Sequence, residues 1–411
     1  MAKKIEKNII TGLDIGTSKV MALIGEIAPD GTIEIIGMGS HPSRGLKRGV
    51  VVDIEATVNS IQRAVQEAEL MAGCEVRTVY AGIAGSHIRS LNSHGIVAIR
   101  DKEVSQADVE RVIEAAKAVA IPADQKILHI LPQEFIIDYQ GSIREPVGMA
   151  GIRLESRVHV VTGSVSAAQN IVKCVRRCGL EINEIILEQL ASSHAVLTED
   201  EKELGVCLID IGGGTTDIAI FSEGAIQHTA VIPIAGDQVT NDIAMALRTP
   251  TKAAESIKIN HACALPELAN SSQMLEVASV SDRPGRKISA TALSDVVCAR
   301  YEELFTLVRN ELARSGFEDR MAAGIVITGG AAKVNGAIEL AELCFEMPVR
   351  IGCAHHVVGL AEAIENPSFA TGVGLLLHGF QQQYDVRYVP AMNENTRSIW
   401  LRMKEWFQGD F

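Results

Sequence analysis

The chain has 411 residues, a formal net charge of −13, 47% apolar residues and only 4% aromatic residues. This length is enough for two sizeable lobes with aliphatic cores, and the negative charge argues against general nucleic-acid binding. The eight cysteines include no CxxC pair, so we expect reduced thiols rather than disulfides or a metal centre. Asp14 interrupts the first apolar stretch too early for a signal peptide, and no apolar run reaches the roughly 18 residues that span a bilayer.

Strand and helix patterns alternate along most of the chain, which predicts an α/β architecture. Two apolar runs, 9–16 and 20–25, enclose a glycine turn and are expected to form a hairpin. A third strand is expected at 33–38. Residues 53–72 predict a helix, because apolar residues recur there at helical spacing.

The segment from 85 to 165 has a different pattern. Ser105, followed three residues later by Asp108, is typical of a helix start with a capping box, and Pro122 is expected to stop that helix. Short strands are then expected at 127–130, 134–139 and 157–161. We interpret the segment as a small α+β insert in the first lobe; the alternative is that it belongs to that lobe's own sheet.

The second half of the chain continues the alternation of helices and strands. Helices are expected at 167–177, 188–197, 236–247, 252–258 and 293–312, and a buried strand at 324–328. Residues 281–287 predict a polar loop with basic side chains. Residues 381–396 are polar with little periodicity, which is typical of a flexible linker, and the last residues become amphipathic.

One short pattern occurs in both halves of the chain. Residues 13–20 read LDIGTSKV and residues 209–220 read IDIGGGTTDIAI. A glycine turn between two strands allows the backbone to approach a phosphate closely and to point its N–H groups at the oxygens. The matching aspartates, Asp14 and Asp210, therefore predict two related lobes that face one nucleotide from opposite sides.

The predicted phosphate site takes residues from both turns. The first turn supplies Gly16, Thr17, Ser18 and Lys19, and the second supplies Gly212, Gly213, Gly214, Thr215 and Thr216. Asp14 and Asp210 suit a hydrated magnesium ion, because Mg²⁺ keeps several waters and takes help from carboxylates. Lys19 would neutralise phosphate charge.

A purine site is expected beside it. Gly329 and Gly330 end a buried strand where a backbone can pass close to a base, and Glu255 and Lys258 share one helix face that would hold a ribose and a base edge. Gly236, Ala331 and Lys333 complete the predicted cofactor contacts. Each piece alone has an ordinary interpretation, namely a hairpin turn, a strand-to-helix turn or an exposed helical pair, so the prediction rests on their order and spacing.

In this order of segments the chain resembles the actin-like ATPase superfamily. The resemblance implies a duplicated, ribonuclease H-like fold of two lobes, with ATP and Mg²⁺ as ligands. It also implies a water-positioning polar residue on the helix at 188–197, for which Glu188 and Gln189 are candidates; the alternative is a helix cap or a surface residue. Asp14, Glu188 and Asp210 would then form the catalytic set of at most a slow ATPase.

Longer motifs are similar to the FtsA family of bacterial cell-division proteins. These motifs are PSRGLKRG at 42–49, LPQEFIIDY at 131–139, ASSHAVLTEDEKELGVCLIDIGGGTTDIAIF at 191–221 and GIVITGGAA at 324–332. The resemblance covers essentially the whole chain, and it implies that the usual actin-type insert of the first lobe is replaced by another one elsewhere.

The resemblance gives a division of the chain. It places the first lobe at 1–84, 166–195 and 361–380, its insert at 85–165, the second lobe at 196–233 and 313–360, its own insert at 234–312, a linker at 381–396 and an amphipathic helix at 397–411.

The tail has the pattern of a helix that lies in a membrane surface. Both tryptophans of the chain lie there. The apolar arc consists of Ile399, Trp400, Met403, Trp406 and Phe407, and Arg402 and Lys404 flank it. The alternative is a terminal helix docked on the protein's own core, which a polar tether disfavours. One such helix binds weakly, whereas several on a polymer bind strongly because each later contact is intramolecular.

The resemblance implies a membrane tether at the division site, on the cytoplasmic face of the inner membrane. Its partners would be an anionic membrane surface, the C-terminal tail of the tubulin-like protein FtsZ, other copies of itself and later division proteins. Arg300 and Tyr301 are the candidates for the FtsZ contact, and ordinary helix surface is the alternative. Rival functions are a pilus-assembly scaffold and a small-molecule kinase, although no separate catalytic base for a kinase is evident.

Overall fold

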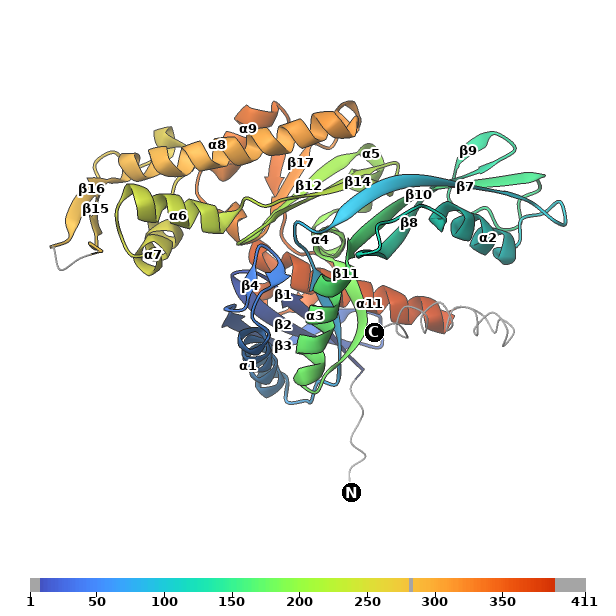
Figure 1. Ribbon diagram of the computed structural model, residues 1–411, viewed down its shortest axis with the longest axis horizontal. Helices are drawn as coiled ribbons and strands as arrows, with labels where there is room; N and C mark the ends of the chain where they lie inside the picture. Colours follow the sequence, from blue (N-terminus) through green and yellow to red (C-terminus); the bar gives the residue numbers. More distant parts are fainter. Residues whose placement is uncertain (1–7, 281–283, 389–411) are drawn as a thin grey trace, which may run out of the picture.

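A six-stranded sheet forms the centre of the first lobe, with the strand order β11-β6-β1-β2-β3-β19. The computed structural model describes residues 8–280 and 284–388 of the chain (Figure 1). The strands of this sheet are β1 (Ile9–Ile15), β2 (Lys19–Ile27), β3 (Ile33–Pro42), β6 (Thr78–Ile83), β11 (Glu181–Leu187) and β19 (Val357–Gly359). The expected hairpin is confirmed, since β1 and β2 pair antiparallel from Ile9 opposite Glu26 to Ile15 opposite Val20.

The second lobe repeats this arrangement. Its strands are β12 (Val206–Ile211), β13 (Thr216–Ser222), β14 (Ala225–Ile232), β17 (Ile325–Thr328) and β18 (Val349–Ile351). The order β14-β13-β12-β17-β18 matches β3-β2-β1-β6-β11 of the first lobe strand for strand, with two antiparallel and two parallel pairings in the same places. The duplicated α/β fold predicted from the repeated pattern is therefore confirmed.

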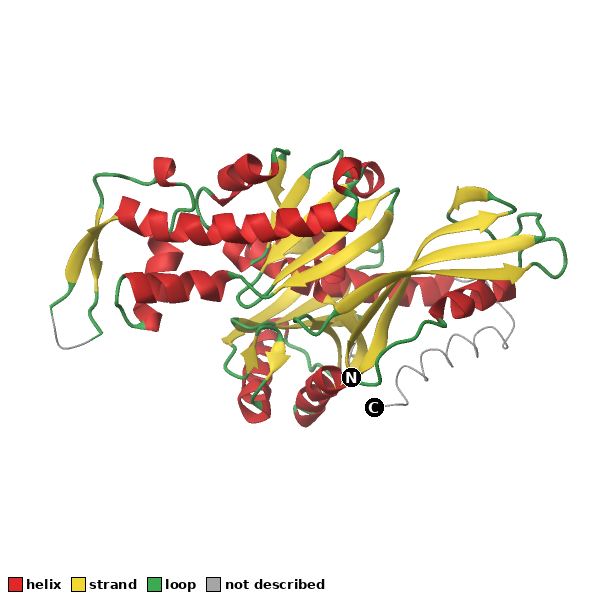
Figure 2. Cartoon of the chain, turned by 45° about the horizontal axis from the view of Figure 1, so that its top comes forward, coloured by secondary structure: helices red, strands yellow, loops and turns green. Residues whose placement is uncertain are grey.

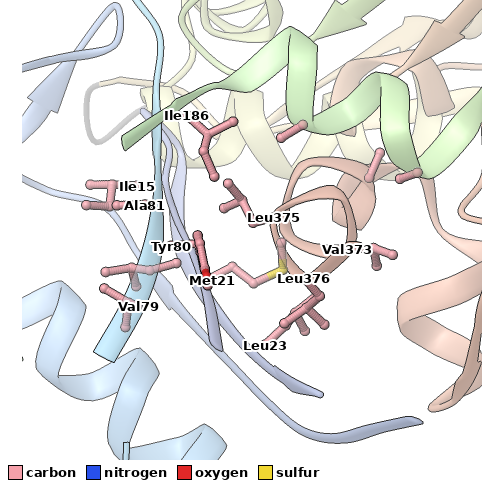
Figure 3. Packing of buried hydrophobic residues seen from close by; sticks show 14 of the residues in the cluster. Ile15, Met21, Leu23, Val79, Tyr80, Ala81, Ile186, Val373, Leu375 and Leu376 are labelled. Atoms are coloured by element: carbon pink, nitrogen blue, oxygen red, sulfur yellow. The ribbon is translucent and has the colours of Figure 1, made fainter. Parts of the chain in front are cut away.

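Helices cover both faces of the first sheet. Helices α1 (Ile54–Ala72) and α3 (Val165–Arg177) lie below it in Figure 1, and α4 (Glu188–Val196) and α11 (Ala370–Tyr388) lie between the lobes. Apolar side chains of α11 pack directly on the strands, with Leu375 and Leu376 facing Met21 and Leu23 (Figure 3). Burying aliphatic side chains of this size contributes on the order of 1.5–3 kcal/mol each, so α11 is a main source of stability for this lobe.

An insert projects from each lobe, in opposite directions (Figures 1 and 2). The first is a four-stranded sheet, β7-β10-β8-β9, covered by α2 (Gln106–Lys117), and its strands are β7 (Arg89–Ala98), β8 (Gln125–Ile137), β9 (Gln140–Ile143) and β10 (Arg153–Ser164). It has its own small core around Leu154. The second insert consists of α6 (Gly236–Ala246), α7 (Thr251–His261), a hairpin of β15 (Met274–Val277) and β16 (Arg286–Ser289), and α8 (Ala290–Ser315).

The remaining elements are short. They are β4 (Leu46–Lys47), β5 (Val50–Val51), α5 (Glu199–Leu204), α9 (Ala337–Phe345) and α10 (Ala361–Glu365). Within the described ranges 8–280 and 284–388, no helix is long and apolar enough to cross a membrane.

The insert differs in detail from the sequence-based expectation. The capping box of Ser105 and Asp108 is present, but α2 ends at Lys117, before Pro122. The two strands expected at 127–130 and 134–139 are one continuous strand, β8, which passes through Pro132 at a shift in register. Proline is tolerated there because a bulge does not need its missing N–H.

The closing segment is also different. The expected single helix at 361–380 is two helices, α10 and α11, and α11 continues to Tyr388. The linker expected from residue 381 is therefore helical in its first part. The hairpin of β15 and β16 replaces part of the polar loop expected at 281–287, because Arg286 and Lys287 pair with β15.

The crossing of α4 and α11 yields a test of how closely these two helices of the first lobe must pack. A Cβ atom added to Gly374 on α11 would overlap the backbone carbonyl of Ala191 on α4. We expect Gly374→Ala to lower the free energy of unfolding by on the order of 3 kcal/mol, because neither backbone can give way without displacing a helix. Chemical denaturation measures the loss. Gly141→Ala is the control, because its nearest neighbour is the flexible end of Glu134, and an equal effect of both substitutions would contradict the explanation.

Candidate nucleotide site

The two predicted phosphate-binding turns meet at the interface between the lobes. A Cβ atom on Gly213 would lie 2.7 Å from Cβ of Ser18, and one on Gly214 would lie 2.6 Å from Oγ1 of Thr17. Glycine is therefore required at both positions for the turns to approach so closely. The close approach brings together the two groups of residues that the sequence predicts to bind phosphate.

Each turn is fixed by a hydrogen bond that a backbone N–H outside the turn donates to it. The N–H of Gly49 donates to Oγ1 of Thr17 at 2.9 Å, which fixes the first turn to the turn between β4 and β5. In the second turn, the N–H of Asp237 donates to the carbonyl of Gly213 at 2.8 Å. The start of helix α6 therefore fixes the shape of the second turn.

Four carboxyl groups gather beside the turns. Asp14, Asp210 and Asp217 are buried at 8%, 7% and 3% exposure, and Glu188 is half-buried at the start of α4. Burial is the main cause that raises the pKa of Asp14 to about 7; Lys19 opposes the rise, and the neighbouring Asp210 adds to it. Burial, followed by repulsion from the three aspartates, raises the pKa of Glu188 well above its usual value. A cation placed here would relieve this repulsion, so the residues present fit a hydrated magnesium ion.

Asp217 was not among the residues nominated from the sequence. It stands directly opposite Asp210 in the β12–β13 pairing. Its Oδ2 accepts from Oγ1 of Thr215 at 2.9 Å, whereas its Oδ1 is buried with no hydrogen-bond partner among the described residues. Burial and the charge of Asp210 raise its pKa to about 8. The signal was available, because Asp217 closes the motif IDIGGGTTD, but only the pairing register places it beside Asp210.

The two candidates on α4 have different surroundings. Glu188 interacts with Asp14, Asp210 and Asp217, so its carboxyl faces the site. Gln189 is fully buried, and neither atom of its amide has a hydrogen-bond partner in the part of the chain that is described. The structure therefore favours Glu188 as the polar residue that faces the site.

Lys19 is the cation nearest to the carboxyl groups. Burial lowers its pKa, and the charge of Lys333 lowers it further, while Asp14 raises it. Its ammonium group lies 4.1 Å from the centre of the Phe369 ring, in a cation–π contact. Lys19, the first residue of β2, thus places its positive charge beside the acidic cluster.

The residues predicted to hold the purine and ribose also converge. Nζ of Lys258 donates to the carbonyl of Gly236 at 3.0 Å and pairs with Glu255 at 2.8 Å. A Cβ atom on Gly236 would lie 3.4 Å from Cβ of Ala331. The helix pair α6–α7 is thereby joined to the turn after β17.

The turn after β17 touches the carboxyl cluster directly. Gly329 has a left-handed φ of +91°, and a Cβ atom there would collide with Oδ1 of Asp210. Glycine is required on both grounds. Gly330 is exposed, and Lys333 lies on the short helical turn that follows.

The structure corrects the expectation for Tyr301. Its side chain is 1% exposed, and its hydroxyl donates to the carbonyl of Ala331 at 2.7 Å. Tyr301 lies on α8 and therefore supports the turn after β17, and it is not available to a partner. Arg300 remains on the surface of α8, where it pairs with Asp242 at 2.5 Å and with Glu303. The predicted membrane residues Ile399, Trp400, Arg402, Met403, Lys404, Trp406 and Phe407 lie outside the described residues.

Comparison with solved structures defines the class of this fold. A chain of the PilM–PilN type IV pilus biogenesis complex is similar with a TM-score of 0.66 and 17% identity, over 90% of this chain and 98% of that one. MreB5 of Spiroplasma citri bound to AMPPNP is similar with a TM-score of 0.57 and 16% identity, over 93% and 99%. At these identities the likeness concerns the fold alone, which is the actin-like fold of two lobes.

Sequence comparison then gives the family. The model "Cell division protein FtsA" matches residues 207–374, and the model "SHS2 domain inserted in FTSA" matches residues 85–162, which is the first insert. The cell division protein FtsA of Pseudomonas aeruginosa is 62% identical over 417 aligned residues, covering all of both chains. The chain belongs to the FtsA family of cell-division proteins.

The acidic cluster leads to a prediction about stability. Burial and the charge of Asp210 raise the pKa of Asp217 in the folded state to about 8, far above the pKa of the same group in an unfolded chain. We expect Asp217→Asn to raise the free energy of unfolding of the ligand-free protein at pH 8 by about 1–3 kcal/mol. The raised native pKa means that the parent gains stability as pH falls from 8 toward 4, so the advantage of the variant shrinks over that range.

Thermal melting without nucleotide or metal, at pH 8 and pH 6, measures this difference. The exposed Asp101→Asn is the control, and it is expected to show no such pH dependence. A difference in melting temperature between the Asp217→Asn variant and the parent that stays constant with pH would contradict the origin in Asp217 ionisation.

The hydrogen bond from Tyr301 to the turn after β17 gives a second prediction. Tyr301→Phe keeps the edge-to-face contact with Phe305, whose ring centre lies 5.8 Å away, and removes the hydrogen bond to Ala331. We expect a loss of about 1 kcal/mol in the free energy of unfolding and a few-fold weaker binding of ATP, because the carbonyl is left without its donor. Denaturation and titration with an ATP analogue measure the two effects. Unchanged ATP binding would show that the turn does not contact the nucleotide.

Proposed function

We propose that this protein binds Mg·ATP between its lobes and acts as a membrane tether for the division machinery. The observation that carries the nucleotide part is the convergence of the two glycine turns with Asp14 and Asp210 at one point of the interface. The similarity in fold to an MreB5 structure that contains AMPPNP supports it.

The proposed roles of the residues follow from their positions. The N–H groups of the two turns would bind the phosphates, and Lys19 would neutralise part of their charge. The paired side chains of Glu255 and Lys258 would face the ribose. A bound Mg²⁺, held through water by Asp14 and Asp210, would supply the positive charge that offsets the phosphates.

Hydrolysis is a separate part of the proposal. Glu188 faces the cluster, so its carboxyl is placed to orient a water molecule or, when ionised, to accept a proton from it. A shared fold does not by itself imply turnover. We therefore propose ATP first as a ligand that closes the lobes, and only second as a slow substrate.

The tail carries the membrane part of the proposal. The arc of Ile399, Trp400, Met403, Trp406 and Phe407 would lie in the cytoplasmic surface of the inner membrane, and Arg402 and Lys404 would reach anionic lipid. A single amphipathic helix gives weak, reversible binding. Self-association would strengthen it, since several tails then act together.

The partner part of the proposal concerns the second insert. Arg300 is the remaining candidate for the acidic C-terminal tail of FtsZ, and Glu303 and Asp242 would have to release its guanidinium in exchange. The 62% sequence identity with a cell-division protein over the full length of both chains supports this role over the pilus-scaffold and kinase alternatives. The first insert would contact neighbouring copies and later division proteins.

A sedimentation experiment with vesicles tests the proposal. The intact chain is compared with a chain that ends at Asn395, on vesicles with and without anionic lipid, with and without ATP, and with purified FtsZ present. We expect only the intact chain to pellet with anionic vesicles, more of it with ATP, and FtsZ to pellet only with it. FtsZ without its C-terminal tail is the matched control for the partner.

The possible outcomes separate the parts of the proposal. Equal pelleting of the intact and shortened chains would remove the tail from the mechanism. Vesicle binding that is normal while FtsZ stays in solution would exclude the tether for FtsZ. Vesicle binding and FtsZ recruitment that do not respond to ATP would exclude the nucleotide as the ligand that controls assembly.

A further inference from the structure

Two buried hydroxyl groups surround one oxygen of Asp210. Oγ of Ser192 donates to Oδ2 of Asp210 at 2.5 Å, Oγ1 of Thr371 lies 3.3 Å from the same oxygen, and the two hydroxyls are 3.0 Å apart. Ser192 is fully buried and Thr371 is 8% exposed. The three groups therefore form a closed hydrogen-bonded set away from bulk water.

The hydroxyls and the carboxylate come from different lobes. Ser192 lies within α4 and Thr371 in the first turn of α11, both on the first-lobe side, whereas Asp210 ends strand β12 of the second lobe. The close crossing of α4 and α11 at Gly374 brings the two helices to this point. The hydrogen bonds therefore cross the interface between the lobes.

The direction of the Ser192 side chain is specific. A serine inside a helix commonly bonds to a carbonyl of its own helix, as Ser193 does with Leu190 at 2.7 Å. The hydroxyl of Ser192 instead points to Asp210. Because Oδ2 is occupied in this way, Oδ1 is left to face Gly329 and the site.

We propose that Ser192 and Thr371 are positioning residues for Asp210. They hold its carboxylate in one orientation, so that Asp210 is ready for a hydrated cation only when the lobes are in the arrangement seen here. This inference rests on the proposed binding of Mg·ATP. It adds that the cation site is assembled across the lobes, by two residues that do not themselves touch the ligand.

The electrostatic surroundings explain why such donors matter. Burial raises the pKa of Asp210, and the hydrogen bonds from Ser192 and Thr371 lower it, as does the charge of Lys19. The other charged groups around it are Asp14 on β1, Asp217 on β13 and Glu188 on α4, whose carboxyls repel it. Without the hydroxyls, Lys19 alone would oppose the effect of burial on this carboxyl.

Four variants of the full chain test the inference. Thr371→Val removes the hydroxyl and keeps the branched shape, Thr371→Ser keeps a hydroxyl, and Ser192→Ala alone and together with Thr371→Val removes the other donor. The affinity for a fluorescent ATP analogue is measured with and without Mg²⁺. Thermal melting without ligand shows that each variant is folded.

We expect the magnesium-dependent part of the affinity to fall several-fold in Thr371→Val and Ser192→Ala, and further in the double variant. Thr371→Ser should behave like the parent. The pair Thr371→Val and Thr371→Ser suffices if Ser192→Ala does not fold.

Two results would overturn the inference. One is an unchanged magnesium dependence in folded Thr371→Val. The other is an equal loss of affinity with and without Mg²⁺, which would indicate packing alone. If the parent chain does not bind the analogue at all, the proposed nucleotide site itself fails, which is a distinct outcome.

Discussion

The repulsion among four neighbouring carboxyl groups is the constraint on which this structure depends. Asp14, Asp210 and Asp217 are buried close to Glu188, and Lys19 is the cation that partly balances them. Such a cluster destabilises the ligand-free fold, because burying like charges without compensation is costly. Proteins accept this cost at sites where a ligand supplies the missing charge. The uncompensated burial of these carboxyl groups therefore favours a bound cation, as the glycine turns favour a bound phosphate.

The duplicated sheet explains where these groups come from. Asp14 stands opposite Met21 in the first hairpin, and Asp210 stands opposite Asp217 in the second. The two turns have the same length, so Lys19 of the first corresponds to Thr215 of the second. One copy of the hairpin thus contributes a lysine and the other contributes a second acid. The symmetry of the backbone places the site, whereas the differences between the copies determine its charge.

The sequence predicted the features that depend on local chemistry. The glycine turns, the capping box of Ser105 and the position of the first insert all follow from short patterns that packing does not override. The sequence-based predictions were wrong where tertiary contacts determine the structure. Tyr301 turns inward to Ala331, and α11 continues to Tyr388 past a change in composition. Asp217 was missed for a related reason, because its neighbour across the sheet is fixed by register and not by distance along the chain.

The contacts of the first insert limit how the lobes can move. Although the insert branches from the first lobe, its sheet lies against strand β14 of the second, where His159 pairs with Thr229 at 2.9 Å and Gln133 donates to the carbonyl of Ile226 at 3.0 Å. Rotation of the lobes must either break these polar contacts or carry the insert along with the second lobe. Hydrogen bonds between neutral groups contribute only about 0.5–1.5 kcal/mol each, so replacing these contacts by hydrogen bonds to water during such a motion costs little free energy. Helix α11, whose first turn contacts Asp210, belongs to the first lobe, so such a rotation would move it relative to the second lobe and the insert carried with it.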